Sequence, residues 1–242
     1  MTQVVGGVEG LHHGLGRLFV AIGVFDGLHL GHAYLLDHLV TGARARAARP
    51  AVITFDHHPD EVLLGSAPPL LLDADERLAR LAAAGVEVTV VQHFDDAVRR
   101  TPFDGFVKRI AGAVDLAGFL MTPDSAFGHH RRGTPEAVAE LGNRLSFEVV
   151  VVPPMRVDGQ PVSSSEIRRR ISVGDLEGAG ALLGRPYAVV GRVDDAGVVR
   201  FPMPVALPPP GRYRTDEGEL VVESDGCRVI GGPVGDRRLT FT

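Results

Sequence analysis

The stretch LFVAIGVFDGLHLGHAYLLDHLVTGARARAARPAVITF, residues 18–55, decides the fold of this chain. Its first part, residues 18–25, is a short apolar run typical of a buried strand. Residues 32–48 carry apolar side chains at helical spacing, and residues 50–55 form a second apolar run. Strand, helix and strand in this order predict a βαβ unit, in which the two strands lie parallel in one sheet.

The same alternation continues downstream. Helices are predicted over residues 75–85 and 102–114, and strands over 86–94, 116–121 and 147–154. Crossovers between parallel strands are right-handed, and ligands of such sheets gather at the carboxyl ends of the strands. We therefore predict a Rossmann-like α/β domain with a parallel sheet and helices on both faces.

A smaller region of different character begins near Tyr187. A proline-rich break over residues 206–211 is followed by short β-like pieces at 218–224 and 227–232. We expect an α/β domain over residues 1–186 and a small β-rich region over residues 187–242.

The composition excludes several classes of protein. The chain has 242 residues, of which 45% are hydrophobic, and none of its apolar runs is long enough to cross a bilayer. Its first residues lack the basic and apolar regions of a secretory signal, and Cys227 is its single cysteine, so we expect a cytoplasmic protein without membrane contact. A net charge of −5 argues against a general nucleic-acid surface. No protein partner is indicated.

The turn GVFDGLHLGH, residues 23–32, lies between the first strand and the first helix. Gly27 and Gly31 let the backbone approach a ligand closely, and His29 and His32 can both donate to phosphate oxygens. The helix that follows presents free amides and the positive end of its dipole. The turn therefore predicts a phosphate-binding cradle.

The residues of this turn admit two other interpretations. The histidines could be ordinary loop and helix-start residues, although their pairing between glycines at a strand end argues against this. A zinc site made from the same pair is disfavoured because Asp26 is the one further ligand-type residue in the turn. We therefore predict no protein-held metal.

A second candidate anion site lies at residues 163–170. Ser163, Ser164 and Ser165 precede a predicted helix that carries consecutive arginines. Hydroxyls, helix-start amides and one guanidinium could meet on the same anion, and we choose Arg168 because neighbours in sequence point to different faces of a helix. The alternative is a serine cap followed by solvated arginines.

These two motifs, together with TFDHHPDEVL (54–63) and PDSAFGHHRRG (123–133), resemble the adenylyltransferase module of bacterial bifunctional riboflavin kinase/FMN adenylyltransferases. The resemblance extends over about residues 1 to 190. It implies an enzyme that transfers the adenylyl group of ATP to FMN, making FAD and pyrophosphate, with Mg²⁺ accompanying ATP.

The resemblance also implies roles for residues of the turn and of the serine segment. His29 and His32 would stabilise charge on the ATP phosphates, while Gly23, Phe25, Asp26 and Gly27 shape the turn. The serine segment with Arg168 is similar to the family's SSTxIR signature, which contacts the triphosphate from the other side. Ser165 stands at the usual threonine position and keeps the hydroxyl.

The flavin side is implied by the resemblance alone. Its residues match the family's FxPHP segment and its aspartate- and arginine-containing segment, and they are Phe55, His58, Pro59, Asp124, Phe127, Gly128 and Arg131. His57 stands where proline is usual, and Thr122, Ser125 and Ala126 also depart from the family pattern. Phe55 and Phe127 could equally be core aromatics.

The last region resembles a shortened, altered riboflavin kinase module. In the family this β-barrel module opens with a GFPTAN-like motif, to which RFPMPVALPPPGRY, residues 200–213, corresponds. Met203 and Val205 stand where the metal-binding threonine and its asparagine partner would be, so neither oxygen ligand is present. We expect no riboflavin kinase activity.

Two alternatives to FMN adenylyltransferase activity follow from these departures. One is the same chemistry on another flavin or nucleotide, which the changes at Thr122, Ser125 and Ala126 motivate. The other is a flavin or nucleotide sensor without catalytic activity. The complete histidine and serine motifs argue against the sensor.

Overall fold

The computed structural model describes residues 2–242, which group by their contacts into two units. The first unit comprises residues 2–25, His32–Ala67 and Leu78–Met155. The second comprises Asp26–Gly31, Pro68–Arg77 and Arg156–Thr242. The division into modules at residue 186 stays a prediction, because the second unit holds two helices that precede Tyr187 as well as the β-rich region.

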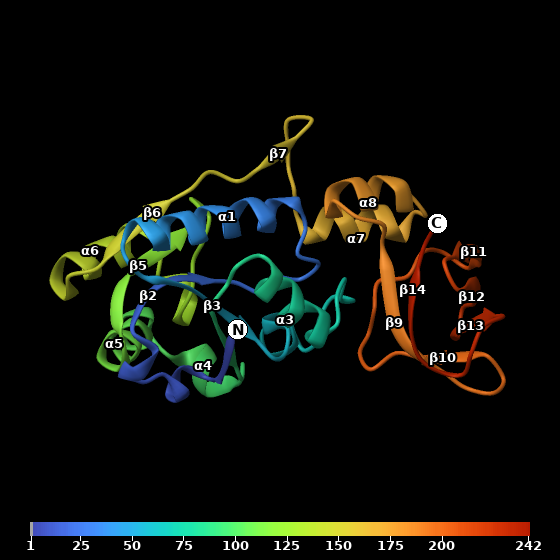
Figure 1. Cartoon of the computed structure of the whole chain (residues 1–242), viewed down its shortest axis with the longest axis horizontal. Helices are drawn as coiled ribbons and strands as arrows, with labels where there is room; N and C mark the ends of the chain where they lie inside the picture. Colours follow the sequence, from blue (N-terminus) through green and yellow to red (C-terminus); the bar gives the residue numbers. More distant parts are fainter. Residues whose placement is uncertain (1) are drawn as a thin grey trace. The chain divides into compact units, whose positions relative to one another are not determined.

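The first unit contains a six-stranded parallel sheet with strand order β1-β4-β3-β2-β5-β6 (Figure 1). Its strands are β1 (Gln3–Gly6), β2 (Arg17–Ile22), β3 (Arg49–Phe55), β4 (Val88–Gln92), β5 (Asp115–Met121) and β6 (Glu148–Val151). The helices along this part of the chain are α1 (Leu30–Ala45), α2 (Pro59–Leu64), α3 (Ala74–Ala83), α4 (Asp96–Arg100), α5 (Phe103–Ala113) and α6 (Pro135–Leu145). Parallel order and intervening helices confirm the predicted Rossmann-like class.

The alternation of side chains along β2 explains why helices cover both faces of this sheet. Leu18 and Val20 point into a core shared with α5 and α6, whereas Phe19 points to the opposite face. On that face the α1 helix lies over Phe19: the guanidinium of Arg46, just beyond the helix, stands 4.8 Å from the ring centroid. A strand buried on both sides has to be apolar throughout, which is why β2 shows a continuous apolar run in the sequence.

At the start of the sheet, one predicted boundary was wrong and one strand was missed. The strand expected over residues 18–25 ends at Ile22, because Phe25 takes a φ of 53° and the chain turns there. The sheet also has a strand before Arg17 that was not predicted. β1 is short and mostly exposed, so its pattern is weak, and its pairing with β4 is the reason that it forms.

The second unit contains an antiparallel sheet with strand order β11-β12-β13-β10-β9-β14. Figure 1 shows its long strands β9 and β14 side by side. A bridge between Thr215 and Phe241 joins the ends of the two edge strands, so the sheet closes on itself. The elements of this unit are β7 (Arg156–Val157), β8 (Gln160–Pro161), α7 (Ser164–Ser172), α8 (Leu176–Leu183), β9 (Ala188–Val193), β10 (Val198–Arg200), β11 (Gly211–Thr215), β12 (Gly218–Val222), β13 (Cys227–Ile230) and β14 (Gly235–Thr240).

One core joins the helices and the sheet of the second unit. Ile167 and Ile171, one turn apart on α7, are fully buried in the same cluster as Leu220 and Leu239 of the sheet. Tyr187 stacks on Phe241 with ring centroids 5.6 Å apart. This packing fixes the N-terminal end of α7, where the serine segment lies.

Candidate active site

The turn between β2 and α1 is built from backbone conformations that few residues adopt. Phe25, Gly27 and Leu28 have φ values of 53°, 82° and 39°. A Cβ atom on Gly27 would lie 2.9 Å from the side chain of Leu71, so glycine is required there on two counts. Residues Asp26–Gly31 belong to the second unit, and we call them the turn segment.

Asp26 anchors the turn segment through a buried ion pair. Its Oδ2 lies 2.5 Å from Nη2 of Arg168, and its side chain is only 4% exposed. The backbone N–H of Leu71 donates to both carboxylate oxygens, at 2.9 and 3.2 Å. Arg168 also donates from Nε to the carbonyl of Pro69, at 2.7 Å. The arginine chosen from the sequence therefore holds the turn segment in place.

Arg185 is a second basic residue at the turn segment, and it was not singled out from the sequence. Its Nη2 donates to the carbonyl of Gly27 at 2.6 Å, and its Nη1 donates to the carbonyl of Leu28 at 3.1 Å. The signal that could have found it is the basic residue within LLGRPY, which follows the last helix of this region. Two guanidinium groups thus bind the first half of the segment.

The serine segment meets the turn segment at the start of α7. Ser163 caps the helix, because its hydroxyl accepts from the backbone N–H of Glu166 at 3.2 Å. The hydroxyl of Ser164 donates to the carbonyl of Asp26 at 2.9 Å. Ser165 is exposed. The first two serines therefore have structural contacts, while the third presents its hydroxyl to solvent.

The two arginines that follow Arg168 lie on other faces of α7. Arg169 and Arg170 form ion pairs with Glu166, at 2.7 and 3.0 Å. These contacts are exposed and stabilise the helix weakly. Of these three arginines, only Arg168, one helical turn beyond Ser164, contacts the turn segment.

His29 is buried in this positively charged surrounding. Its exposed fraction is 4%, and burial together with the charges of Arg185 and Arg168 lowers its pKa from 6.5 to about 4. Its ring is therefore neutral near neutral pH and can act as a hydrogen-bond donor without carrying a charge. A Cβ on Gly31 would lie 3.1 Å from the Nδ1 of this ring, so the glycine leaves room for it.

This depressed pKa predicts a pH-dependent stability. His29 takes up a proton near pH 6.5 in the unfolded chain and near pH 4 in the folded chain. Its contribution to the free energy of unfolding is therefore fully present above pH 6.5 and is lost as the pH falls toward 4. The free energy of unfolding should fall by up to about 3 kcal/mol more in the native chain than in His29→Gln over this window. Urea unfolding of both chains across the window measures the difference. An imidazole NMR resonance of His29 that titrates near 6.5 would contradict the prediction.

His32 lies in the first unit, on the first turn of α1. Its ring packs against Phe25, with centroids 5.1 Å apart. A Cβ on Gly23 would lie 3.1 Å from the Phe25 ring, so the glycine leaves room for this ring. Gly23, Phe25 and His32 thus form one small cluster at the carboxyl end of β2.

The segment that follows β3 has clear local structural roles. His58 is the N-cap of α2, since its Nδ1 accepts from the backbone N–H of Asp60 at 3.2 Å, and Pro59 occupies the first turn of the helix. The ring of Phe55 makes an edge contact with Phe94, with centroids 5.3 Å apart.

The other segment predicted for the flavin side follows β5. Asp124 accepts a hydrogen bond from the hydroxyl of Thr122, at 2.9 Å, and Arg131 donates to the Asp124 carbonyl at 3.4 Å. Phe127 packs on the core aromatics Phe106 and Phe119. β3 and β5 are parallel strands of one sheet, so both segments lie at its carboxyl edge.

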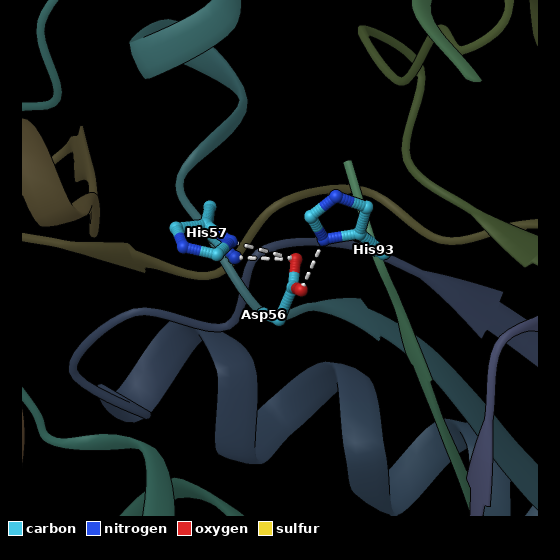
Figure 2. Close-up of side chains that lie close together, drawn as sticks. All are labelled: Asp56, His57 and His93. Atoms are coloured by element: carbon cyan, nitrogen blue, oxygen red, sulfur yellow. Dashed lines mark hydrogen bonds and ion pairs between the residues drawn. The ribbon is translucent and has the colours of Figure 1, made fainter. Parts of the chain in front are cut away.

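A further cluster at this edge was not foreseen. Asp56 follows β3, and His93 follows the neighbouring strand β4; Figure 2 shows the carboxylate of Asp56 between the rings of His57 and His93. Nδ1 of His93 lies 2.6 Å from Oδ2, and Nδ1 of His57 lies 3.1 Å from Oδ1. Burial alone would raise the pKa of Asp56, but the hydrogen bonds with His93 and His57 outweigh it and lower that pKa to about 2.

The region predicted to replace the kinase motif is packed within the second unit. Val205 bridges to Leu70, and the backbone of Leu70 bonds on both sides, to Pro204 and to Ala206. Met203 and Val205 line a cavity of only about 10 Å³. This volume holds no more than a single water molecule.

Among residues 2–242, no helix has the length and apolar character needed to cross a membrane.

The sheet and the turn define an α/β protein of Rossmann-like class with its distinctive side chains at the carboxyl edge. Residues 12–166 match the family model described as FAD synthetase. The chain belongs to the FAD synthetase family and carries that family's domain.

Relatives found by sequence agree with this assignment. The bifunctional riboflavin kinase/FMN adenylyltransferase of Haemophilus influenzae is 31% identical over 193 residues, which cover 79% of this chain and 63% of the relative. The protein of the same description from Listeria monocytogenes is 30% identical over 72% of this chain and 56% of the relative. The chain thus matches less than two thirds of the length of these relatives.

One solved structure has a similar fold over the whole chain. The crystal structure titled macrolide-efflux protein from Streptococcus pneumoniae superposes with a TM-score of 0.85, covering 100% of this chain and 98% of that one. At 23% sequence identity, this likeness concerns the fold alone.

Proposed function

We propose that this protein is an FMN adenylyltransferase that makes FAD and pyrophosphate from FMN and ATP. The observation that carries the proposal is the buried, neutral ring of His29 in the turn segment, which lies under the positive charges of Arg168 and Arg185. Family membership supports the same reaction, and the names of the relatives described above include this activity.

The reaction is an in-line displacement. An oxygen of the FMN phosphate attacks the α-phosphorus of ATP, a new P–O bond forms, and the bond to the bridging oxygen breaks as pyrophosphate leaves. A phosphate monoester is already ionised near neutral pH, so the protein needs no nucleophile of its own. Its contribution is to align the two phosphates and to stabilise the charge that develops between them.

The residues of the turn segment suit this task. His29 donates a hydrogen bond from a neutral ring, and the nearby guanidinium groups supply a positive field that does not depend on pH in the physiological range. Further proposed donors to phosphate oxygens are His32 at the start of α1 and, separately, the hydroxyl of Ser165. Gly23, Phe25, Gly27 and Gly31 keep the backbone in the required shape.

Mg²⁺ is proposed to arrive with ATP as part of the substrate. The carboxylate in the turn segment is that of Asp26, and both of its oxygens are engaged by Leu71 and Arg168. Asp26 therefore suits a positioning role, and the phosphates of ATP would hold the ion. The ion would neutralise charge on the leaving pyrophosphate.

The flavin is proposed to occupy the carboxyl edge of the parallel sheet in the first unit. The segments around Phe55 and Asp124 both lie at this edge. His58 and Pro59 shape the first segment by starting α2, and Phe127 and Arg131 shape the second. These residues set the acceptor pocket chiefly by fixing the backbone.

Riboflavin is not expected to be phosphorylated by this chain. Met203 and Val205 offer no oxygen ligand for a metal ion, and the cavity they line is too small for a nucleotide. Incubating the purified chain with Mg²⁺, ATP and either FMN or riboflavin, followed by chromatography, should yield FAD from FMN and no product from riboflavin. FMN formed from riboflavin would refute the expected loss of kinase activity, and absence of FAD in the FMN reaction would refute the proposed function.

A further inference from the structure

We propose that Asp56, His57 and His93 form a surface binding site for a divalent transition-metal ion of the Zn²⁺ type. Each residue offers one ligand atom, and these atoms all lie within 4.8 Å of one another. It is the one such group of three or more His, Cys, Asp or Glu side chains found within residues 2–242. The proposal does not depend on the adenylyltransferase reaction.

Two neighbouring strands bring the ligands together. Asp56 directly follows β3 and His93 directly follows β4, and these strands pair in parallel with Phe55 opposite Gln92. The backbone N–H of Asp56 donates to the carbonyl of Gln92 at 3.2 Å, which ties the two strand ends. The ligands therefore stand on ordered backbone, although they are 37 residues apart in the chain.

The carboxylate is also held by backbone donors. Its Oδ1 accepts from the N–H of His57 at 2.7 Å and from the N–H of Phe94 at 3.2 Å. Hydrogen bonds of this kind orient a metal-binding carboxylate from outside the coordination shell. Oδ2 faces His93, and a metal ion bound there would take the place of the proton shared at 2.6 Å.

The imidazole rings are accessible and can adjust. The side chains of His57 and His93 are 53% and 65% exposed, and their ring centroids are 5.7 Å apart. Figure 2 shows a nitrogen of each ring turned toward the carboxylate. Because the rings are exposed, rotation about their side-chain bonds can adjust both nitrogens toward the tetrahedral arrangement that the ion requires.

The chemistry of the ligands selects the ion. Two imidazoles and one carboxylate suit Zn²⁺, Co²⁺ or Ni²⁺, whereas Mg²⁺ and Ca²⁺ prefer sets made of oxygen atoms. Three protein ligands leave at least one coordination position for water, as in open zinc sites. His57 stands where the family pattern has proline, so this ligand is one of the positions at which this chain differs from that pattern.

The test is a titration of the full chain with Zn²⁺ alone, competed against a chromophoric chelator. We expect one equivalent per chain, with affinity at least about 10-fold weaker in Asp56→Asn, His57→Gln and His93→Gln, since even outer-shell changes cost this much. Bound Zn²⁺ should raise the melting temperature of the native chain more than that of the variants. Co²⁺ in place of Zn²⁺ should give a visible absorption band that His93→Gln removes.

Matched controls use histidines elsewhere. His13→Gln changes an exposed histidine, and a double variant of His129 and His130 removes another close pair of rings, with centroids 3.8 Å apart. Both controls should bind Zn²⁺ as the native chain does. Equal affinity in the native chain and in His93→Gln overturns the proposal, as does loss of binding in the His129 and His130 variant alone. Melting without metal establishes that each variant is folded.

Discussion

Replacing His29 with alanine should lower the rate of adenylyl transfer by about 100-fold or more, because one preorganised donor to a developing charge is commonly worth that much. The ring is buried and lies under the influence of two guanidinium charges, and solvent cannot replace its hydrogen bond there. We expect a smaller effect on folding, since the Asp26–Arg168 pair and the contacts of Arg185 still hold the turn segment. Steady-state rates of FAD formation, with unfolding curves of the same samples, measure both.

Two companion variants sharpen this experiment. His13→Ala removes an exposed histidine and should leave the rate unchanged. Gly31→Ala keeps the imidazole but places a Cβ 3.1 Å from it, so it should lower the rate by displacing the ring. Loss of activity in His29→Ala that is fully explained by a loss of folded protein would assign the histidine a structural role instead.

Replacing Asp26 with alanine should destabilise the protein by about 3 to 5 kcal/mol, because it leaves the mostly buried charge of Arg168 without its partner. The same change frees the backbone N–H of Leu71, which donates to this carboxylate. Activity should fall as well, since the turn segment loses its anchor. Urea unfolding of the native chain and the variant gives the free-energy difference.

A double-mutant cycle separates the ion pair from the other contacts of Asp26. The double variant Asp26→Ala with Arg168→Met removes both charges, so it should be more stable than Asp26→Ala alone. The exposed pair of Arg169 with Glu166 provides the matched control, and breaking it should lower the free energy of unfolding only slightly. A cost of that small size for Asp26→Ala would show that the buried pair does not anchor the turn.

Sequence patterns predicted the fold well where burial is strong on both sides of a segment. β2 and β3 carry continuous apolar runs, and the predicted class follows from them and from the intervening helix. The exposed strand β1 has no such pattern and was missed. The end of β2 was placed too late because Phe25 continues the apolar run while its backbone has already turned.

The candidate site was likewise predicted only in part from the sequence. The amino-acid sequence by itself identified the turn segment and the serine segment as candidate parts of the site, because their glycines, histidines and hydroxyls are grouped within short stretches of the chain. Tertiary structure alone decided that Arg168 meets Asp26 across 142 positions and that Arg185 meets Gly27 across 158. It likewise decided that His93 meets Asp56. The physical reason is that such contacts depend on packing and strand pairing between distant segments, which leave no periodic signal in the chain.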